Sequence, residues 1–177
     1  MSDLFSFPAK RGMSSHHKII GNCDIWLTPP EIIKGLGSFD LDPCAAPDPR
    51  PWETAKHHYN ERDNGLILPW HGRVWMNPPY DHRVIGSWLG RLADHGNGVA
   101  LIYARTETEI FHKFVWNKAD AILFFKGRLT FYKPCGDKAA GNGGAPSCLV
   151  AYGPENARSL IEANYDNPVF AGKYVKL

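Results

Sequence analysis

The sequence has few of the features that mark several common protein classes. No apolar run approaches the roughly 20 residues that span a bilayer, so we expect no transmembrane segment. The four cysteines form no CxxC pair, which argues against both a disulfide framework and a zinc site. Several histidines are direct neighbours in sequence, and such pairs rarely face one metal, so we expect no metal.

The sequence also has little excess of one charge sign over the other. The formal net charge is only +2, so any argument for a nucleic-acid partner must come from local patches. The first 20 residues have no apolar core of the signal-peptide type, which predicts a cytosolic protein. Hydrophobic residues make up 44% of the chain and charged residues 21%, a balance typical of a folded domain. We expect residues 1–22 to form a mobile leader and residues 23–177 one domain.

Apolar runs alternate with helical patterns along the chain, which predicts an α/β fold in three layers. Thr28 is expected to cap the first helix, with Glu31 as its capping-box partner. The continuous run GVALIY predicts a strand buried on both faces of a parallel sheet. The expected helices are 29–36, 85–93, 107–117 and 154–163. The expected strands lie at the start of 38–46 and at 66–68, 73–76, 98–103, 121–125 and 147–152. A further extended piece is expected at 129–132, with loops over 47–64 and 133–146.

The stretch WMNPPY, residues 75–80, carries the strongest chemical signal. Two successive prolines cannot continue a strand, because they remove two amide donors and fix φ twice. The Asn77 side-chain oxygen and the Pro78 carbonyl are therefore two acceptors on a stiff backbone, beside the ring of Tyr80. Such a pair suits an NH2 group, which has two hydrogens to donate, and the ring offers a stacking surface for a planar base or amide.

Methylation of such a nitrogen would use this geometry. Its lone pair is delocalised, and fixed acceptors for both hydrogens favour a more tetrahedral and more nucleophilic nitrogen. Acceptors aimed at a nitrogen that becomes positive also stabilise the transition state. The methyl source would be a sulfonium held in line with the nitrogen.

Several stretches together resemble the small phage-type Dam family of DNA N6-adenine methyltransferases. They are WLTPPE (26–31), FDLDPCA (39–45), DNGLILPW (63–70), VWMNPPY (74–80), ALIYARTET (100–108) and GRLTF (127–131). The NPPY motif alone also occurs in enzymes that methylate RNA and protein amides, whereas the order of these stretches is more specific. The resemblance implies a Rossmann-like fold that binds S-adenosylmethionine, double-stranded DNA as partner and adenine N6 as acceptor.

The resemblance also implies roles for individual residues. Asn77 and Pro78 would hold the target amino group, Pro79 would keep the corner rigid, and Tyr80 would stack on the flipped base. The residues that would contact the cofactor are Thr28, Pro29, Asp40, Asp42, Cys44 and Asp63. Thr28 also fits a plain helix cap, Cys44 a small buried hydrophobe, and Asp63 a turn residue before Gly65.

The sequence departs from many methyltransferases in its front half. Ala45–Pro49 stands where a glycine-rich loop commonly follows the first strand. The interval from Asp42 to Asn77 is short for a full set of strands, so we expect a trimmed front half of the sheet. No inserted domain for reading DNA sequence is evident.

Residues 126–138 combine basic and aromatic side chains, the mixture expected for phosphates and unstacked bases. The same pattern also fits a basic strand edge that prevents aggregation. The candidate DNA contacts are Lys126, Arg128, Lys133 and Lys138 in this stretch, with Arg83 and Arg105 near strand ends. Reaching adenine N6 in a duplex requires base flipping. Arg128 or a residue of 133–146 is a candidate to fill the gap.

Three other functions compete with DNA adenine methylation. The nearest is an NPPY methyltransferase that acts on RNA or on a protein glutamine. A second is a catalytically idle nucleic-acid-binding module, although the intact motif argues against decay. A third is a metal-dependent hydrolase, which the ligand spacing disfavours. Oligomeric state and recognition sequence cannot be predicted from this sequence.

Overall fold

A mixed β-sheet forms the centre of the computed structural model, which describes residues 25–177. The leader predicted for residues 1–22 lies outside the described residues. The strands are β1 (Leu41–Asp42), β2 (His57–His58), β3 (Val74–Met76), β4 (Gly98–Tyr103), β5 (Ala121–Phe125), β6 (Ser147–Tyr152) and β7 (Gly172–Lys176). The α-helices are α1 (Pro30–Leu36), α2 (Ile85–His95), α3 (Glu109–Phe111) and α4 (Pro154–Asp166). A wider helical turn extends α3 over His112–Trp116, and a 3₁₀ turn spans Pro168–Phe170.

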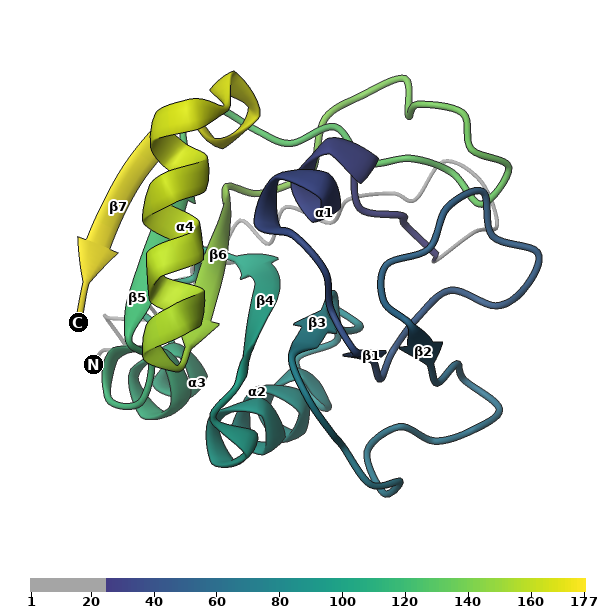
Figure 1. Ribbon diagram of the computed structural model, residues 1–177, viewed down its shortest axis with the longest axis horizontal. Coiled ribbons are helices and arrows are strands. Elements are labelled where there is room, and N and C mark those ends of the chain that lie inside the picture. Colours follow the sequence, from purple (N-terminus) through teal and green to yellow (C-terminus); the bar gives the residue numbers. More distant parts are fainter. Residues whose placement is uncertain (1–24) are drawn as a thin grey trace, which may run out of the picture.

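The sheet has seven strands in the order β2-β1-β3-β4-β6-β5-β7 (Figure 1). Strands β2, β1, β3 and β4 are mutually parallel, with Val74 opposite Gly98 and Met76 opposite Ala100. Strand β6 runs antiparallel to β4 and β5, and β7 runs antiparallel to β5. The carboxyl ends of β1, β3 and β4 therefore meet at one edge of the sheet.

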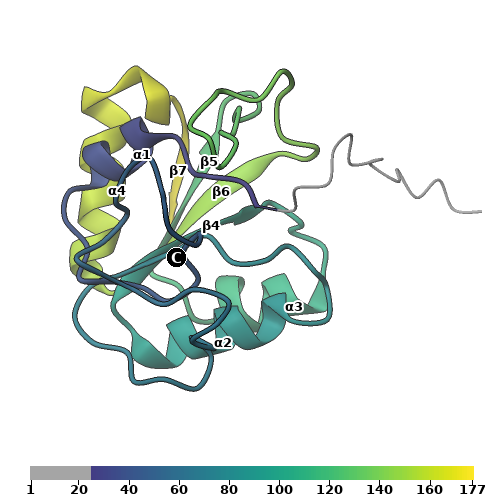
Figure 2. The same cartoon turned by 90° about the vertical axis from the view of Figure 1, so that its right-hand side faces the viewer.

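Helices cover both faces of this sheet (Figure 2), with α1 and α4 on one side and α2 and α3 on the other. Alternation along β4 supplies both cores, because Val99 and Leu101 face α1 and α4 while Ala100 and Ile102 face α2 and α3. Burial on both faces explains the unbroken apolar sequence of this strand. The three-layer α/β prediction is confirmed at this level.

Most predicted elements are present, and the errors concern short or edge elements. Residues 66–68 form turns, so the strand predicted there is wrong. The loop predicted for 47–64 contains the two-residue strand β2, and the C-terminal edge strand β7 was not predicted. Strand β4 lies in a parallel pair on its β3 side only, because β6 is antiparallel to it. The helix predicted over 107–117 becomes α3 with its wider turn.

The start of α1 also differs from the prediction. Pro29 is the N-cap residue, and no side chain caps the helix. The prediction of Thr28 as N-cap with Glu31 in a capping box is therefore wrong. Thr28 precedes the cap by one residue and is buried. It lines the cavity instead.

Candidate active site

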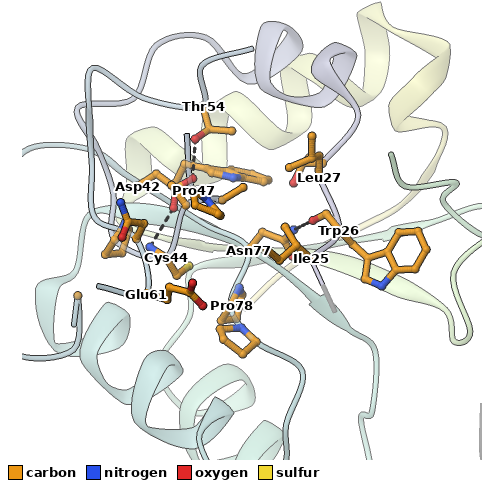
Figure 3. Close-up of a pocket in the computed structure, with 18 of the residues that line it drawn as sticks. Ile25, Trp26, Leu27, Asp42, Cys44, Pro47, Thr54, Glu61, Asn77 and Pro78 are labelled. Carbon is orange, nitrogen blue, oxygen red and sulfur yellow. Dashed lines mark hydrogen bonds between the residues drawn. The ribbon is translucent and has the colours of Figure 1, made fainter. Parts of the chain in front are cut away.

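A cavity of about 420 Å³ opens at the carboxyl ends of β1 and β3 (Figure 3). This is the position at which open α/β sheets usually bind ligands, and the volume lies within the range of small-molecule sites. Residues from the segment before α1, from the loops after β1 and β2 and from the corner after β3 line it. They include Thr28, Asp42, Cys44, Arg50, Trp52, Thr54, Glu61, Trp75, Asn77, Pro78, Pro79 and Tyr80.

Asn77 is the first residue beyond β3, and both ends of its side-chain amide are hydrogen-bonded. Its Nδ2 donates to the Trp26 carbonyl oxygen at 3.2 Å, and its Oδ1 accepts from the Tyr80 hydroxyl at 2.9 Å. These two contacts fix which end of the amide is the acceptor. An amide oxygen has two lone pairs, so Oδ1 can accept one further hydrogen.

Tyr80 is held as firmly as Asn77. Its hydroxyl also lies 3.2 Å from the Leu101 carbonyl oxygen, and its ring stacks on Tyr103 with centroids 4.2 Å apart and planes 15° apart. Burial, with a smaller contribution from Tyr103, raises the pKa of Tyr80 well above its ordinary value. The hydroxyl therefore stays protonated and remains a donor to Asn77. One face of the ring is covered by Tyr103.

Asp42, the last residue of β1, is a buried acid in the cavity wall. Its Oδ2 accepts from the Thr54 hydroxyl at 2.5 Å and its Oδ1 from the Cys44 amide at 3.1 Å. Burial raises the pKa of Asp42 to about 6, although these hydrogen bonds act in the opposite direction. The protein thus places a poorly compensated carboxylate at the cavity, which is suited to a cationic ligand group.

Cys44 lies beside Asp42 and is half-buried. Burial, with a smaller contribution from Asp42, raises the pKa of the Cys44 thiol well above its ordinary value. A neutral thiol is a small apolar wall rather than a nucleophile.

Three of the predicted cofactor residues do not reach the cavity. Asp40 lies at the opposite end of β1, where its carboxylate accepts from the Arg73 amide at 2.8 Å and pairs with Lys56 at 2.8 Å. Asp63 is exposed, and its Oδ2 accepts from the Asn60 amide at 2.9 Å, so it is a turn residue. Pro29 is buried as the N-cap of α1 and is not among the cavity-lining residues.

The loop 47–64 contributes more to the cavity than its polar sequence suggested. Arg50 lines the cavity with its side chain only 10% exposed, and it pairs with Asp48 and Glu53. Trp52, Thr54 and Glu61 also line it. Gly65 allows the following segment to approach, because a Cβ there would lie 1.8 Å from the Pro43 oxygen. Trp52, a large aromatic residue in a nominally polar loop, was the available signal, and it is half-buried.

The Trp75 indole N–H is an unpaired donor in the described part of the chain. It is buried and has no hydrogen-bond partner among residues 25–177, although Trp75 belongs to the cavity lining.

Some of the candidate DNA contacts belong to a loop that reaches the rim of the cavity. The loop 126–146 joins the cavity rim through Tyr132, which pairs with Leu27 by backbone hydrogen bonds of 2.8 and 3.0 Å and packs edge-on against Trp52. The loop residues Lys126, Arg128, Lys133 and Lys138 are exposed. Arg105 is exposed just beyond β4. Arg83 is exposed but paired with Asp81, so its charge is partly neutralised locally.

Comparison with known proteins identifies the enzyme class. The seven-strand mixed sheet, with a cavity and an Asn-Pro-Pro-Tyr corner at its carboxyl edge, is consistent with a methyltransferase. The family model described as DNA N-6-adenine-methyltransferase (Dam) matches residues 15–173, and the chain belongs to this family. The protein is therefore an enzyme that methylates adenine N6, and DNA is its substrate. No curated protein and no solved structure gave a match.

Two further features are absent from the described part of the chain. None of the helices within 25–177 is long and apolar enough to cross a membrane. In the same part of the chain, no three His, Cys, Asp or Glu side chains gather as a potential metal site.

Proposed function

We propose that the enzyme transfers a methyl group from S-adenosylmethionine to N6 of an adenine that is flipped out of duplex DNA onto the Asn77–Tyr80 corner. The observation that carries this proposal is the doubly anchored Asn77 amide. Trp26 and Tyr80 hold it so that Oδ1 remains the acceptor at the wall of a cavity large enough for a nucleotide-like ligand.

The corner acts on the acceptor nitrogen. Asn77 Oδ1 and the Pro78 carbonyl accept the two N6 hydrogens, which concentrates the nitrogen lone pair. As the nitrogen becomes positive, the same carbonyl dipoles stabilise the charge without reorganising, because the two prolines and the Tyr80 contact already fix them. The excess proton leaves the nitrogen after transfer, so the site requires no general base.

Tyr80 provides the surface for the flipped base. Tyr103 supports one face of its ring, which leaves the opposite face for adenine. Base flipping costs a few kcal/mol, and stacking in the pocket offsets part of that cost. Tyr103 is thus a positioning residue for Tyr80. The sequence feature that could have indicated Tyr103 is an aromatic residue at the carboxyl end of β4.

The cavity residues fit S-adenosylmethionine chemically. When bound, the cofactor supplies an electrophilic methyl group on a sulfonium. The uncompensated Asp42 carboxylate suits the ammonium of its methionine portion, and the Arg50 guanidinium suits the carboxylate. Glu61 is an exposed acid in the cavity wall and can accept hydrogen bonds from ribose hydroxyls. Thr28 supplies a further hydroxyl beside the corner.

Methyl transfer from labelled S-adenosylmethionine tests the proposal directly. Unmethylated duplex DNA, RNA and cell protein serve as parallel acceptors, and nucleosides from labelled DNA are then separated. We expect N6-methyladenine in duplex DNA, and sequencing of that DNA maps the recognition site. Label confined to RNA or protein would overturn the choice of substrate, and binding of DNA without S-adenosylmethionine binding would overturn the cofactor.

A further inference from the structure

Trp26 is an exposed aromatic residue directly beside the candidate catalytic asparagine. Trp26 is 38% exposed, whereas the other tryptophans among residues 25–177 are buried or half-buried. Within residues 25–177, no aromatic ring packs against its indole, and no hydrogen bond holds its indole N–H. Its carbonyl oxygen nevertheless accepts from Asn77 Nδ2 at 3.2 Å. An exposed ring therefore stands one hydrogen bond away from the target-binding amide.

The backbone that carries this ring is well anchored. The next residue, Leu27, is buried and exchanges backbone hydrogen bonds of 2.8 and 3.0 Å with Tyr132. Thr28 follows and is buried as well. Exposure of Trp26 is thus a property of a fixed segment, and little ordering entropy remains to be lost at its backbone when a partner binds.

The direction of the ring selects the kind of partner. In Figure 3 the Trp26 ring points away from the cavity, whereas Asn77 and Pro78 face it. Trp26 belongs to the cavity lining, but its ring is turned away from the other lining residues, so the ring is badly placed to stack on a cofactor in the cavity. The segment that carries Trp26 is joined to the loop 126–146 through the backbone bridge between Leu27 and Tyr132. Figure 2 shows the loop and this segment running side by side. This loop carries the exposed cations Lys126, Arg128, Lys133 and Lys138 against the single acid Asp137.

A flat apolar ring beside a basic loop matches the two parts of a nucleic acid, a base and its phosphates. We propose that Trp26 stacks on a nucleobase of the DNA at the mouth of the site, next to the place from which the target adenine leaves the helix. This inference rests on the proposed function and adds a DNA contact outside the cavity. Trp26 thereby replaces Arg128 and the residues of 133–146 as the candidate that compensates for the stacking lost when the adenine leaves the helix.

Binding of a short duplex that contains the mapped site tests this contact. The titration uses S-adenosylhomocysteine to prevent turnover. We expect Trp26→Ala to weaken DNA binding roughly tenfold, the usual loss for one stacked base, and Trp26→Phe to recover most of it. The backbone carbonyl that holds Asn77 is retained in both variants. Tyr165→Ala is the matched control, because Tyr165 is 80% exposed on α4 and outside the cavity lining, and we expect no change.

Removing bases from the DNA then identifies the stacking partner. Three duplexes carry an abasic position in turn at the thymine opposite the target and at each base beside the target. The penalty of Trp26→Ala should disappear on the one duplex that lacks the partner base and persist on the other two. A role of Trp26 in folding alone would lower binding to all duplexes equally.

The outcomes separate this inference from the proposed function. Equal DNA affinity for Trp26→Ala and the unmodified enzyme would overturn the stacking contact, as would a penalty that persists on all three abasic duplexes. Either result is compatible with normal adenine methylation. An unmodified enzyme that binds DNA but never methylates it would instead overturn the proposed function, and the Trp26→Ala binding penalty would then be measured on duplex DNA of mixed sequence.

Discussion

The two ends of the sheet use polar groups in opposite ways. At the amino-terminal end, the Arg73 guanidinium donates to Asn156 Oδ1 at 2.7 Å, Ser159 Oγ at 2.8 Å and the Leu36 carbonyl at 2.7 Å. Asp40 accepts from the Arg73 amide and pairs with Lys56. These polar groups are satisfied within the protein and join α1, β3 and α4.

At the carboxyl-terminal end, several polar groups retain charge or hydrogen-bond acceptors that the protein itself does not satisfy. Asp42 has a raised pKa, Asn77 Oδ1 has an unused lone pair, and Glu61 lies exposed at the cavity. The difference teaches that one end of the sheet stabilises the fold, while the other is arranged for a ligand. Substitutions at the two ends should therefore separate activity from stability.

The largest effect is expected at the carboxyl-terminal end. Asn77→Ala removes the acceptor for the target amino group, and we expect methyl transfer to fall about 10³-fold, as for loss of a preorganised group that stabilises developing charge. Cofactor affinity and the melting temperature should change little. Single-turnover rates with labelled S-adenosylmethionine measure the loss. Asn77→Asp retains an acceptor, so its rate of methyl transfer should lie between those of Asn77→Ala and the unmodified enzyme. Unchanged turnover of Asn77→Ala would disprove the role of the corner.

The next largest effect is expected at the amino-terminal end. Arg73→Met leaves Asn156, Ser159 and the Leu36 carbonyl without their donor, and we expect the free energy of unfolding to fall by about 4 kcal/mol. Urea denaturation measures the loss, with Lys34→Met on the exposed face of α1 as control. The rate of methyl transfer per folded molecule should be preserved. A selective loss of that rate would show that this end also serves catalysis.

The two acids at opposite ends of β1 should respond to pH with opposite signs. Asp42 has a folded-state pKa of about 6 against 3.8 in the unfolded chain, so ionisation costs stability as pH rises through this range. Asp42→Asn should therefore gain stability relative to the unmodified protein between pH 4 and pH 7.5, by about 3 kcal/mol for a shift of about two pKa units.

Asp40 provides the opposite case on the same strand. The Arg73 amide and Lys56 hold the pKa of Asp40 below its ordinary value, so its contribution is present at neutral pH and is lost as pH falls. Asp40→Asn should accordingly lose stability relative to the unmodified protein as pH rises. Thermal unfolding of both variants at several pH values tests the pair. The same sign for both would contradict the assignment of Asp42 as the uncompensated acid.

The smallest effect concerns the basic loop. If Lys133 and Lys138 contact phosphates, replacing both by Gln should reduce the slope of log affinity against log salt by roughly 2. DNA titrations at several salt concentrations measure the slope. Lys118→Gln is the control, because Lys118 precedes β5 at the amino-terminal end of the sheet and pairs with Asp94. An unchanged slope would remove the two lysines from the DNA interface.

Local chemistry made the position of the Asn77–Tyr80 corner predictable from sequence. Asn77–Tyr80 needs only a strand that ends and two prolines, and the structure places it at a cavity as expected. Strand β2 could not be predicted, because two histidines carry no periodic signal and form a strand only by pairing with β1. Asp40 and Asp42 share a residue type and a motif, so only the position of β1 in the sheet separates their environments.

The roles of the loop 47–64 were hidden for a similar reason. Thr54 reaches Asp42 across 12 positions of sequence, and Trp52 meets Tyr132 from a still more distant segment. Such contacts depend on tertiary packing, whereas propensity and spacing describe only neighbours along the chain.

The hydrogen bond between Asn77 and Trp26 has a consequence for how the chain acquires activity. It joins residues 51 positions apart, and the backbone bridge from Leu27 to Tyr132 spans a longer stretch still. Contacts of such high sequence separation form late in folding, because loop-closure entropy opposes them until the sheet exists. Synthesis must therefore pass Tyr132 before the corner is complete. Under the proposed mechanism, we expect a nascent chain to remain inactive until then, and a fragment that stops after NPPY to lack methyl transfer.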